Sequence, residues 1–217
     1  MAATSIEWTQ ETWNPTRGCS RVSPGCENCY AEREAARFCG PGGPYEGLVQ
    51  LGPKGPRWTR RVRFIPEKLA EPLGWRKPKV VFVDSMSDLF HEDLTDREIA
   101  AVFGVMAAAK QHTFQVLTKR SERAARWLSG DHDLVGAVCE ALDRLEIQRG
   151  CGSCFDPDEW PLPNVWIGAS IEDEPRAAER IPHLLRSPAA RRFISYEPAL
   201  GAVPWERWIQ PRSVRRQ

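Results

Sequence analysis

The chain has 217 residues, of which 41% are hydrophobic and 27% are charged, and its formal net charge is +1. This composition is that of an ordinary globular protein, and the near-zero charge by itself indicates no polyanionic or membrane partner. No apolar run reaches the roughly 18 residues that a membrane span needs, and the N-terminus lacks the basic-then-apolar order of a secretory signal. We therefore expect a cytoplasmic protein with no membrane partner.

The first third of the chain contains few regular elements. Residues 5–13 alternate like a strand and end at a turn signal, Asn14-Pro15. A loop with three cysteines follows, and residues 30–38 have helical composition. Residues 40–78 are rich in Gly and Pro, which predicts an excursion from the core with one strand at 61–65.

Strands and helices alternate from Lys79 onward. Apolar runs predict strands, and a capping box at Thr95 and Glu98 opens the first helix. The strands are predicted at 79–84, 113–118, 164–170 and 191–197, and the helices at 97–110, 121–128 and 175–186, the last one interrupted or shifted at Pro182. The alternation predicts an α/β fold with a parallel sheet, either doubly wound or a barrel. We expect residues 1–201 to form one domain, with an insertion at 131–163 that carries a further helix.

Polar side chains stand where the predicted strands end. Ligands bind at the carboxyl ends of strands in parallel α/β folds, so these positions predict a binding site. Any one of them could simply be a polar loop residue, but the pattern recurs at four successive strands. The candidates are Asp84, Ser85, Asp88, Thr118, Lys119, Ser170, Glu172 and Glu197.

The strongest motif is the loop GCSRVSPGCENCYAE, in which Cys19, Cys26 and Cys29 have the spacing C-x6-C-x2-C. In a reducing compartment, clustered thiolates are more often ligands of soft metals than disulfides. Three ligands leave one iron of a [4Fe–4S] cluster open, whereas structural zinc normally takes four. The alternatives are zinc with a distant fourth ligand such as Cys39, a redox pair of Cys26 and Cys29, or cysteines without a ligand.

Three other features are weaker indications of a binding site than the cysteine loop. Cys151 and Cys154 form a second C-x2-C that could hold zinc or an auxiliary cluster but is more simply interpreted as an exposed loop pair. His91 lies near the predicted strand-end site. A basic strip around Trp58 could bind the phosphates and stack on a base of a nucleic acid, although such strips are usually solvated. The strip consists of Arg57, Arg60, Arg61 and Arg63.

Five ordered blocks cover nearly the whole chain up to Gly201: IEWTQETWNPTRGCSRVSPGCENCYAE, FVDSMSDLFHEDL, FQVLTKRSER, PLPNVWIGASIE and FISYEPALG. Together they resemble a family of phage and prophage proteins that is known by a three-cysteine motif and described as radical-SAM-like. The TKR block and the GC…C-x2-CYA loop are also loosely similar to spore photoproduct lyase, a radical SAM enzyme that repairs DNA.

This resemblance implies a partial (β/α) barrel of radical SAM type with a [4Fe–4S] cluster on Cys19, Cys26 and Cys29. It further implies S-adenosylmethionine at the strand ends and an unknown substrate. The residues expected to contact S-adenosylmethionine or substrate are Ser85, Asp88, Lys119, Ser170, Glu172 and Glu197. The alternative is a non-enzymatic zinc or iron–sulfur module that contacts nucleic acid or a partner protein.

The C-terminal sequence departs from what the resemblance implies. Relatives are expected to continue after FISYEPALG with a strand, a glycine-rich loop and a helix, whereas residues 202–217 form a tail rich in Trp and Arg. We therefore expect a C-terminally shortened fold in which the strand at 191–197 is an exposed edge, with weak or absent turnover.

Overall fold

The computed structural model describes residues 6–130, 132–133, 136–137 and 160–208. Three of the cysteines lie outside these ranges: Cys139, Cys151 and Cys154. The helix predicted within the insertion lies largely outside them as well. None of the helices in the described ranges is long and apolar enough to span a membrane.

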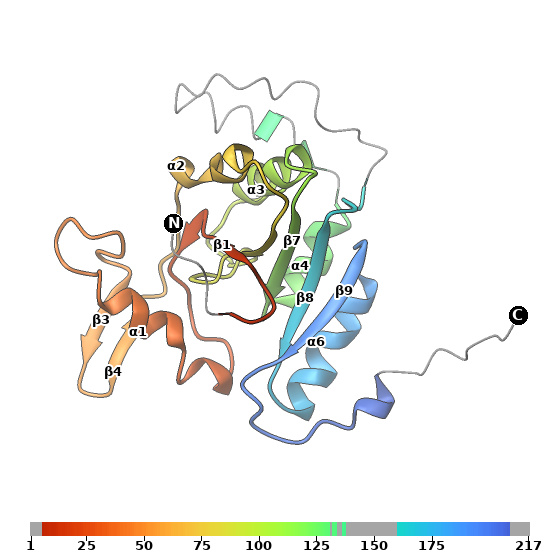
Figure 1. Ribbon diagram of the computed structural model, residues 1–217. Coiled ribbons are helices and arrows are strands. Elements are labelled where there is room, and N and C mark those ends of the chain that lie inside the picture. The colour runs from red at the N-terminus through yellow and green to blue at the C-terminus, as the bar shows by residue number, and fades with distance from the viewer. Residues whose placement is uncertain (1–5, 131, 134–135, 138–159, 209–217) are drawn as a thin grey trace, which may run out of the picture.

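A five-stranded sheet organises the fold (Figure 1), and every strand pair in it is parallel. Its order is β1-β6-β7-β8-β9, so each strand is added beside its predecessor in the chain and the order never reverses. Over the described residues β1 and β9 are the two edges, and the sheet does not close into a barrel. The strands are β1 Glu11–Trp13, β6 Val80–Val83, β7 Thr113–Thr118, β8 Val165–Ile171 and β9 Arg191–Tyr196.

The connecting helices pack on one face of this sheet, where alternate apolar side chains of the strands meet them in the main core. Helix α3 begins after the capping box that Thr95 and Glu98 form, as predicted. The α/β fold with a parallel sheet is therefore confirmed. The helices are α3 Asp96–Ala108, α4 Ser121–Leu128 and α6 Glu174–Arg186.

The predicted interruption of the last helix is wrong, because α6 continues through Pro182. Proline removes one backbone hydrogen bond and strains the preceding turn of a helix. Here Ile181 and Leu184 are buried in the main core, and Arg180 is 1% exposed. Packing of this face holds the helix together across the proline.

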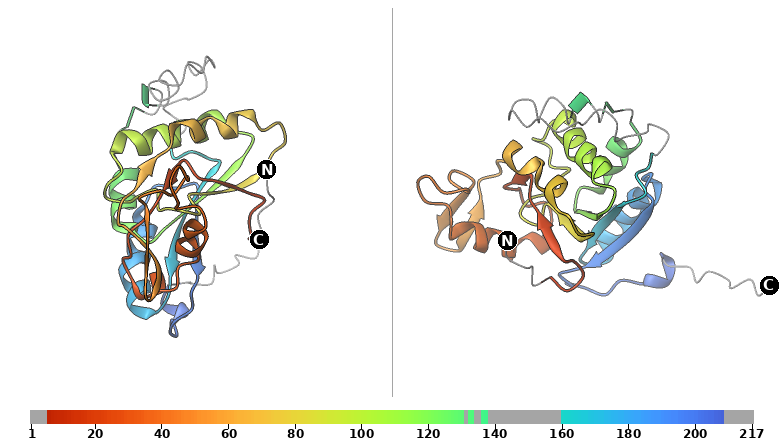
Figure 2. Two further views of the ribbon diagram at one scale, coloured as in Figure 1. Left: turned by 90° about the vertical axis from the view of Figure 1, so that its left-hand side faces the viewer. Right: turned by 45° about the horizontal axis from the view of Figure 1, so that its top comes forward.

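Residues 16–64 form a small lobe beside the sheet (Figure 2), more regular than the excursion that the composition predicted. A hairpin of β3 and β4 packs on α1 around a second apolar cluster that includes Tyr45, Leu48 and Trp58. The elements of the lobe are β2 Thr16–Arg17, η1 Pro24–Cys26, α1 Tyr30–Ala36, β3 Val49–Gly52, β4 Gly55–Trp58 and β5 Arg63–Phe64. The chain then returns to the main core, where α2 Pro66–Leu69 and η2 Glu71–Gly74 pack against α3.

The described part of the tail packs on the domain. Val203 is buried, and Trp205 and Trp208, at the short helix η4 (Trp205–Arg207), contact the main core. Arg207 forms an ion pair with Glu174 at the start of α6, with Nη1 2.6 Å from Oε1.

Candidate functional site at the cysteine loop

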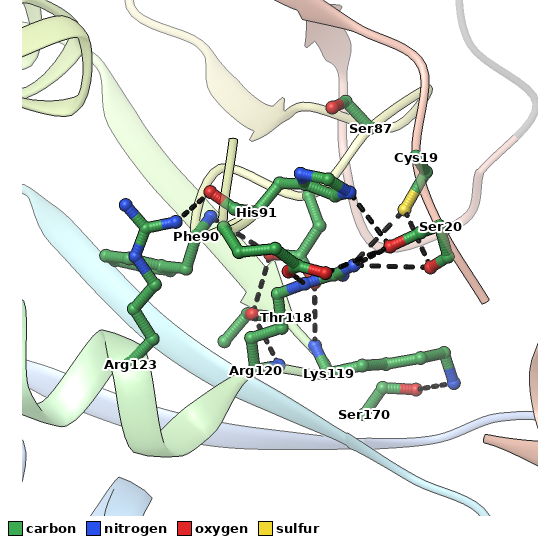
Figure 3. Close-up of polar contacts among 12 residues, drawn as sticks. Cys19, Ser20, Ser87, Phe90, His91, Thr118, Lys119, Arg120, Arg123 and Ser170 are labelled. Carbon is green, nitrogen blue, oxygen red and sulfur yellow. Dashed lines mark hydrogen bonds and ion pairs between the residues drawn. The ribbon is translucent and has the colours of Figure 1, made fainter. Parts of the chain in front are cut away.

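The cysteine loop joins β2 to α1 and lies against the carboxyl ends of the parallel strands (Figure 3). Hydrogen bonds connect it to residues that follow β6, β7 and β8. The structure thus brings the cysteine motif together with most of the predicted strand-end residues, although they are far apart in sequence.

Glu172, directly after β8, fastens the middle of the loop. Its side chain is fully buried, and its Oε2 accepts from the backbone N–H of Gly25 at 2.7 Å. Oε1 accepts from Ser23 Oγ and Lys119 Nζ, both at 2.5 Å, and from Arg180 Nη1 at 3.1 Å. Burial alone would raise the pKa of Glu172, but hydrogen bonds from Lys119, Ser23 and Gly25 outweigh it and lower the pKa to about 2. This carboxylate is charged, and both of its oxygens accept hydrogen bonds.

Arg120, directly after Lys119, fastens the start of the loop. Its Nη2 donates to Ser20 Oγ at 2.7 Å and to the Ser20 carbonyl at 3.2 Å, and its Nη1 lies 3.8 Å from Cys19 Sγ. It also pairs with Asp88 and Glu92 on the segment after β6. Arg120 therefore places a buried positive charge beside the first thiol.

Asp88 has no free acceptor position for a ligand. Its two carboxylate oxygens accept from Thr118 Oγ1 at 2.7 Å, from Arg120 Nη1 and the Lys119 N–H at 3.1 Å, and from the Phe90 N–H at 3.0 Å. The residue is 5% exposed. It ties the end of β7 to the segment after β6.

His91 is buried at 1% exposure and also supports the loop. Its Nδ1 accepts from the Asp93 N–H at 3.1 Å, so Nε2 carries the proton and donates to Ser20 Oγ at 2.9 Å. Burial lowers the pKa of His91, and the nearby charge of Arg120 lowers it further, which keeps the ring neutral.

Ser85, Ser170 and Glu197 lie around the same edge. Ser170 Oγ accepts from Lys119 Nζ at 2.9 Å and donates to the Glu197 carbonyl at 3.0 Å. Ser85 Oγ donates to Asn14 Oδ1 at 3.1 Å, at the end of β1, and its carbonyl accepts from Tyr30 Oη. Glu197 is itself exposed. Ser85 and Glu197 are the more open members of the set, whereas Ser170 is buried.

Asp84 is a buried carboxyl in the left-handed region, with φ 59°. Oδ1 accepts from the Thr16 N–H at 3.1 Å, whereas Oδ2 and the Thr16 hydroxyl have no hydrogen-bond partner within the described ranges. Burial raises the pKa of Asp84 to about 8, against the opposing effect of hydrogen bonding to Thr16. At neutral pH this group is a carboxylic acid.

The three thiols are half-buried and free. Burial raises the pKa of Cys19 to about 12, with Arg120 opposing, and it raises that of Cys29, with the N–H groups of Glu32 and Ala31 opposing. The nearby Cys26 thiol raises the pKa of both groups slightly further. Within the ranges that the structure describes, however, no group of three or more Cys, His, Asp or Glu side chains is arranged to hold a metal ion. The donor chemistry fits a soft metal, and binding would require the thiols to move together.

Sequence reasoning missed Arg120, Ser20 and Arg180, and it misjudged Trp58. Arg120 adjoins Lys119 at a strand end, so the strand-end rule could have found it. No sequence signal marks Arg180, which reaches Glu172 from α6. Trp58 is 6% exposed and packs against Tyr45, so the idea that it stacks on a base is wrong.

Comparison with known protein families identifies the family of this chain. The chain belongs to the DUF5131 family. The family model, described as a protein of unknown function, matches residues 3–208, which includes the cysteine loop and every strand-end residue described above. No curated protein and no solved structure matches the chain.

Proposed function

We propose that this protein binds a [4Fe–4S] cluster through Cys19, Cys26 and Cys29 and acts as a radical SAM enzyme. The observation that carries the proposal is that three free thiols share one loop, which Glu172 and Arg120 fasten to the carboxyl ends of a parallel sheet. A three-thiolate cluster leaves one iron open. Once reduced by an external one-electron donor, such a cluster would supply the electron that cleaves S-adenosylmethionine to methionine and a 5′-deoxyadenosyl radical.

The surrounding residues have separate roles in this proposal. Arg120 offsets the negative charge that thiolates would bring to the buried side of the loop. Glu172 and Asp88, whose oxygens are already occupied, hold the loop and the strand ends in place. Lys119, Ser85, Ser170 and Glu197 are the predicted contacts for S-adenosylmethionine or substrate.

The fold supports the same proposal. The strand order follows the chain without reversal, and helices pack against one face of the sheet. A (β/α) barrel is built in this way, so we propose that the sheet is a partial barrel of radical SAM type.

A zinc module is the second candidate, and one observation favours it. Cys39 is a free, half-buried thiol that packs against the same apolar cluster as Cys19 and Cys29, so it is a candidate fourth ligand. The two candidates predict different effects of removing Cys39.

Metal analysis of anaerobically purified variants separates them. For the cluster, the protein is brown with about four irons per chain, Cys26→Ala is colourless, and Cys39→Ala keeps its iron. The zinc module would be established instead if the unaltered protein contained zinc and no iron, and if Cys39→Ala had lost the zinc.

A further inference from the structure

An arginine-rich surface on the N-terminal lobe takes no part in the site described above. We call it the arginine arm: the exposed side chains of Arg57 on β4, Arg60 and Arg61 in the loop that follows, and Arg63 on β5. Arg63 donates to the carbonyl of Glu46. No carboxylate lies within ion-pair distance of any of the four among the residues that the structure describes.

The backbone here brings positive charges together instead of separating them. In the antiparallel pair of β2 and β5, Arg17 stands directly opposite Arg63. Like charges at directly opposed positions destabilise a sheet, so this pairing favours an anion bound between or beside the two side chains. Among the residues that the structure describes, the Arg17 guanidinium contacts the carbonyl of Pro44 and the ring of Tyr45, and it forms no ion pair.

Arg60 adds an unusual backbone conformation. It has φ 69°, in the left-handed region that residues other than glycine rarely occupy. Such conformations persist where the surrounding structure imposes them, and they concentrate at functional sites. The next residue, Arg61, places its carbonyl where a side chain on Gly18 would lie, so the arm packs directly against the start of the cysteine loop.

We propose that the arginine arm binds the phosphate backbone of a nucleic-acid duplex. Guanidinium groups match phosphate geometry, and a row of them without carboxylate partners gives a salt-dependent, sequence-independent contact. The duplex is favoured over a single strand because the aromatic side chains on the arm's own strands and beneath Arg17 are covered: Tyr45 and Trp58 are buried, and Phe64 is half-buried. The proposal is independent of which metal the cysteines hold.

Fluorescence anisotropy with a short labelled DNA duplex of mixed sequence tests it. The variant replaces Arg57, Arg60 and Arg61 with Gln. The control replaces Arg76 and Lys77 with Gln, an exposed basic pair before the amino end of β6. We expect the triple variant to bind the duplex at least about tenfold more weakly, with a salt slope smaller by about 0.9 for each phosphate that the variant no longer neutralises. The control should bind like the unaltered protein, and metal content and thermal unfolding should be unchanged in both.

Any of three results would overturn the proposal. The first is that the unaltered protein does not bind the duplex, and the second is that the triple variant binds it as well as the unaltered protein does. The third is that a single strand, heparin or an anionic vesicle competes better than the duplex. None of these results would bear on the metal assignment, which is determined from metal content alone.

Discussion

Glu172 and Gly25 are joined across the site: the N–H of Gly25 donates to Oε2 of Glu172 at 2.7 Å, and the carboxylate fills the space that a Cβ at Gly25 would occupy. The close approach links the end of β8 to the loop that carries Cys19, Cys26 and Cys29. It gives Glu172 a positioning role for the cysteines, which sequence reasoning had not assigned to it.

Replacing Glu172 with Ala should destabilise the fold and release the loop together. Arg180 would keep a buried charge without its carboxylate, which costs about 3 to 5 kcal/mol. We therefore expect chemical denaturation to show a free energy of unfolding lower by this amount, and we expect the variant to bind less iron. The analogous change of Glu174, an exposed partner of Arg207, should cost less than about 1 kcal/mol. Normal stability with full iron binding in Glu172→Ala would refute the positioning role.

Gly25→Ala tests the same contact from the loop side. The new methyl group would overlap the Glu172 carboxylate, and overpacking of this kind costs about 1 to 3 kcal/mol. Gly40→Ala is the control, because nothing lies within 4 Å of the position its Cβ would take. In a double-mutant cycle, the cost of Gly25→Ala should largely disappear when Glu172 is already Ala. Simple additivity of the two costs would contradict a direct contact.

The buried carboxyl of Asp84 should make the free energy of unfolding fall as pH rises. The pKa of Asp84 is about 8 in the folded protein and about 3.9 in an unfolded chain, so between these values the folded state holds a proton that the unfolded state has released. Each rise of one pH unit in that window lowers the free energy of unfolding by up to about 1.4 kcal/mol, and the effect levels off above the upper value.

Asp84→Asn should remove this pH dependence of the free energy of unfolding. Asparagine is neutral, has the same shape and tolerates the left-handed backbone at this position. The difference in unfolding free energy between variant and parent should therefore grow in favour of the variant as pH rises through the window. Denaturant titrations at several pH values measure it, and parallel pH profiles would show that Asp84 is already ionised.

Much of the fold was predictable because the signals were local. The strand at 113–118 and the helix at 121–128 match β7 and α4, since an apolar run and a helical stripe with clear ends define them. The hairpin of β3 and β4 was not predicted, because Gly and Pro dominate its sequence and its stability comes from packing on α1. Pro182 was misjudged for the same reason, since tertiary packing outweighs a local helix breaker.

The site was predictable as a set of positions but not as a set of contacts. The rule that ligands bind at strand ends found Lys119, Ser170 and Glu172, which the structure connects. It could not tell that Glu172 and Asp88 use their oxygens internally, because those partners come from loops and helices distant in sequence. Sequence separation likewise hides the approach of Arg120 to Cys19.

The electron paramagnetic resonance spectrum of the reduced, anaerobically purified protein, recorded before and after addition of S-adenosylmethionine, tests the central claim most directly. If Cys19, Cys26 and Cys29 hold a cluster with one open iron, the cluster signal should be present and should change when S-adenosylmethionine binds, and Cys26→Ala should give no such signal. An unchanged signal on addition, or a protein with zinc and no cluster signal, would contradict the account.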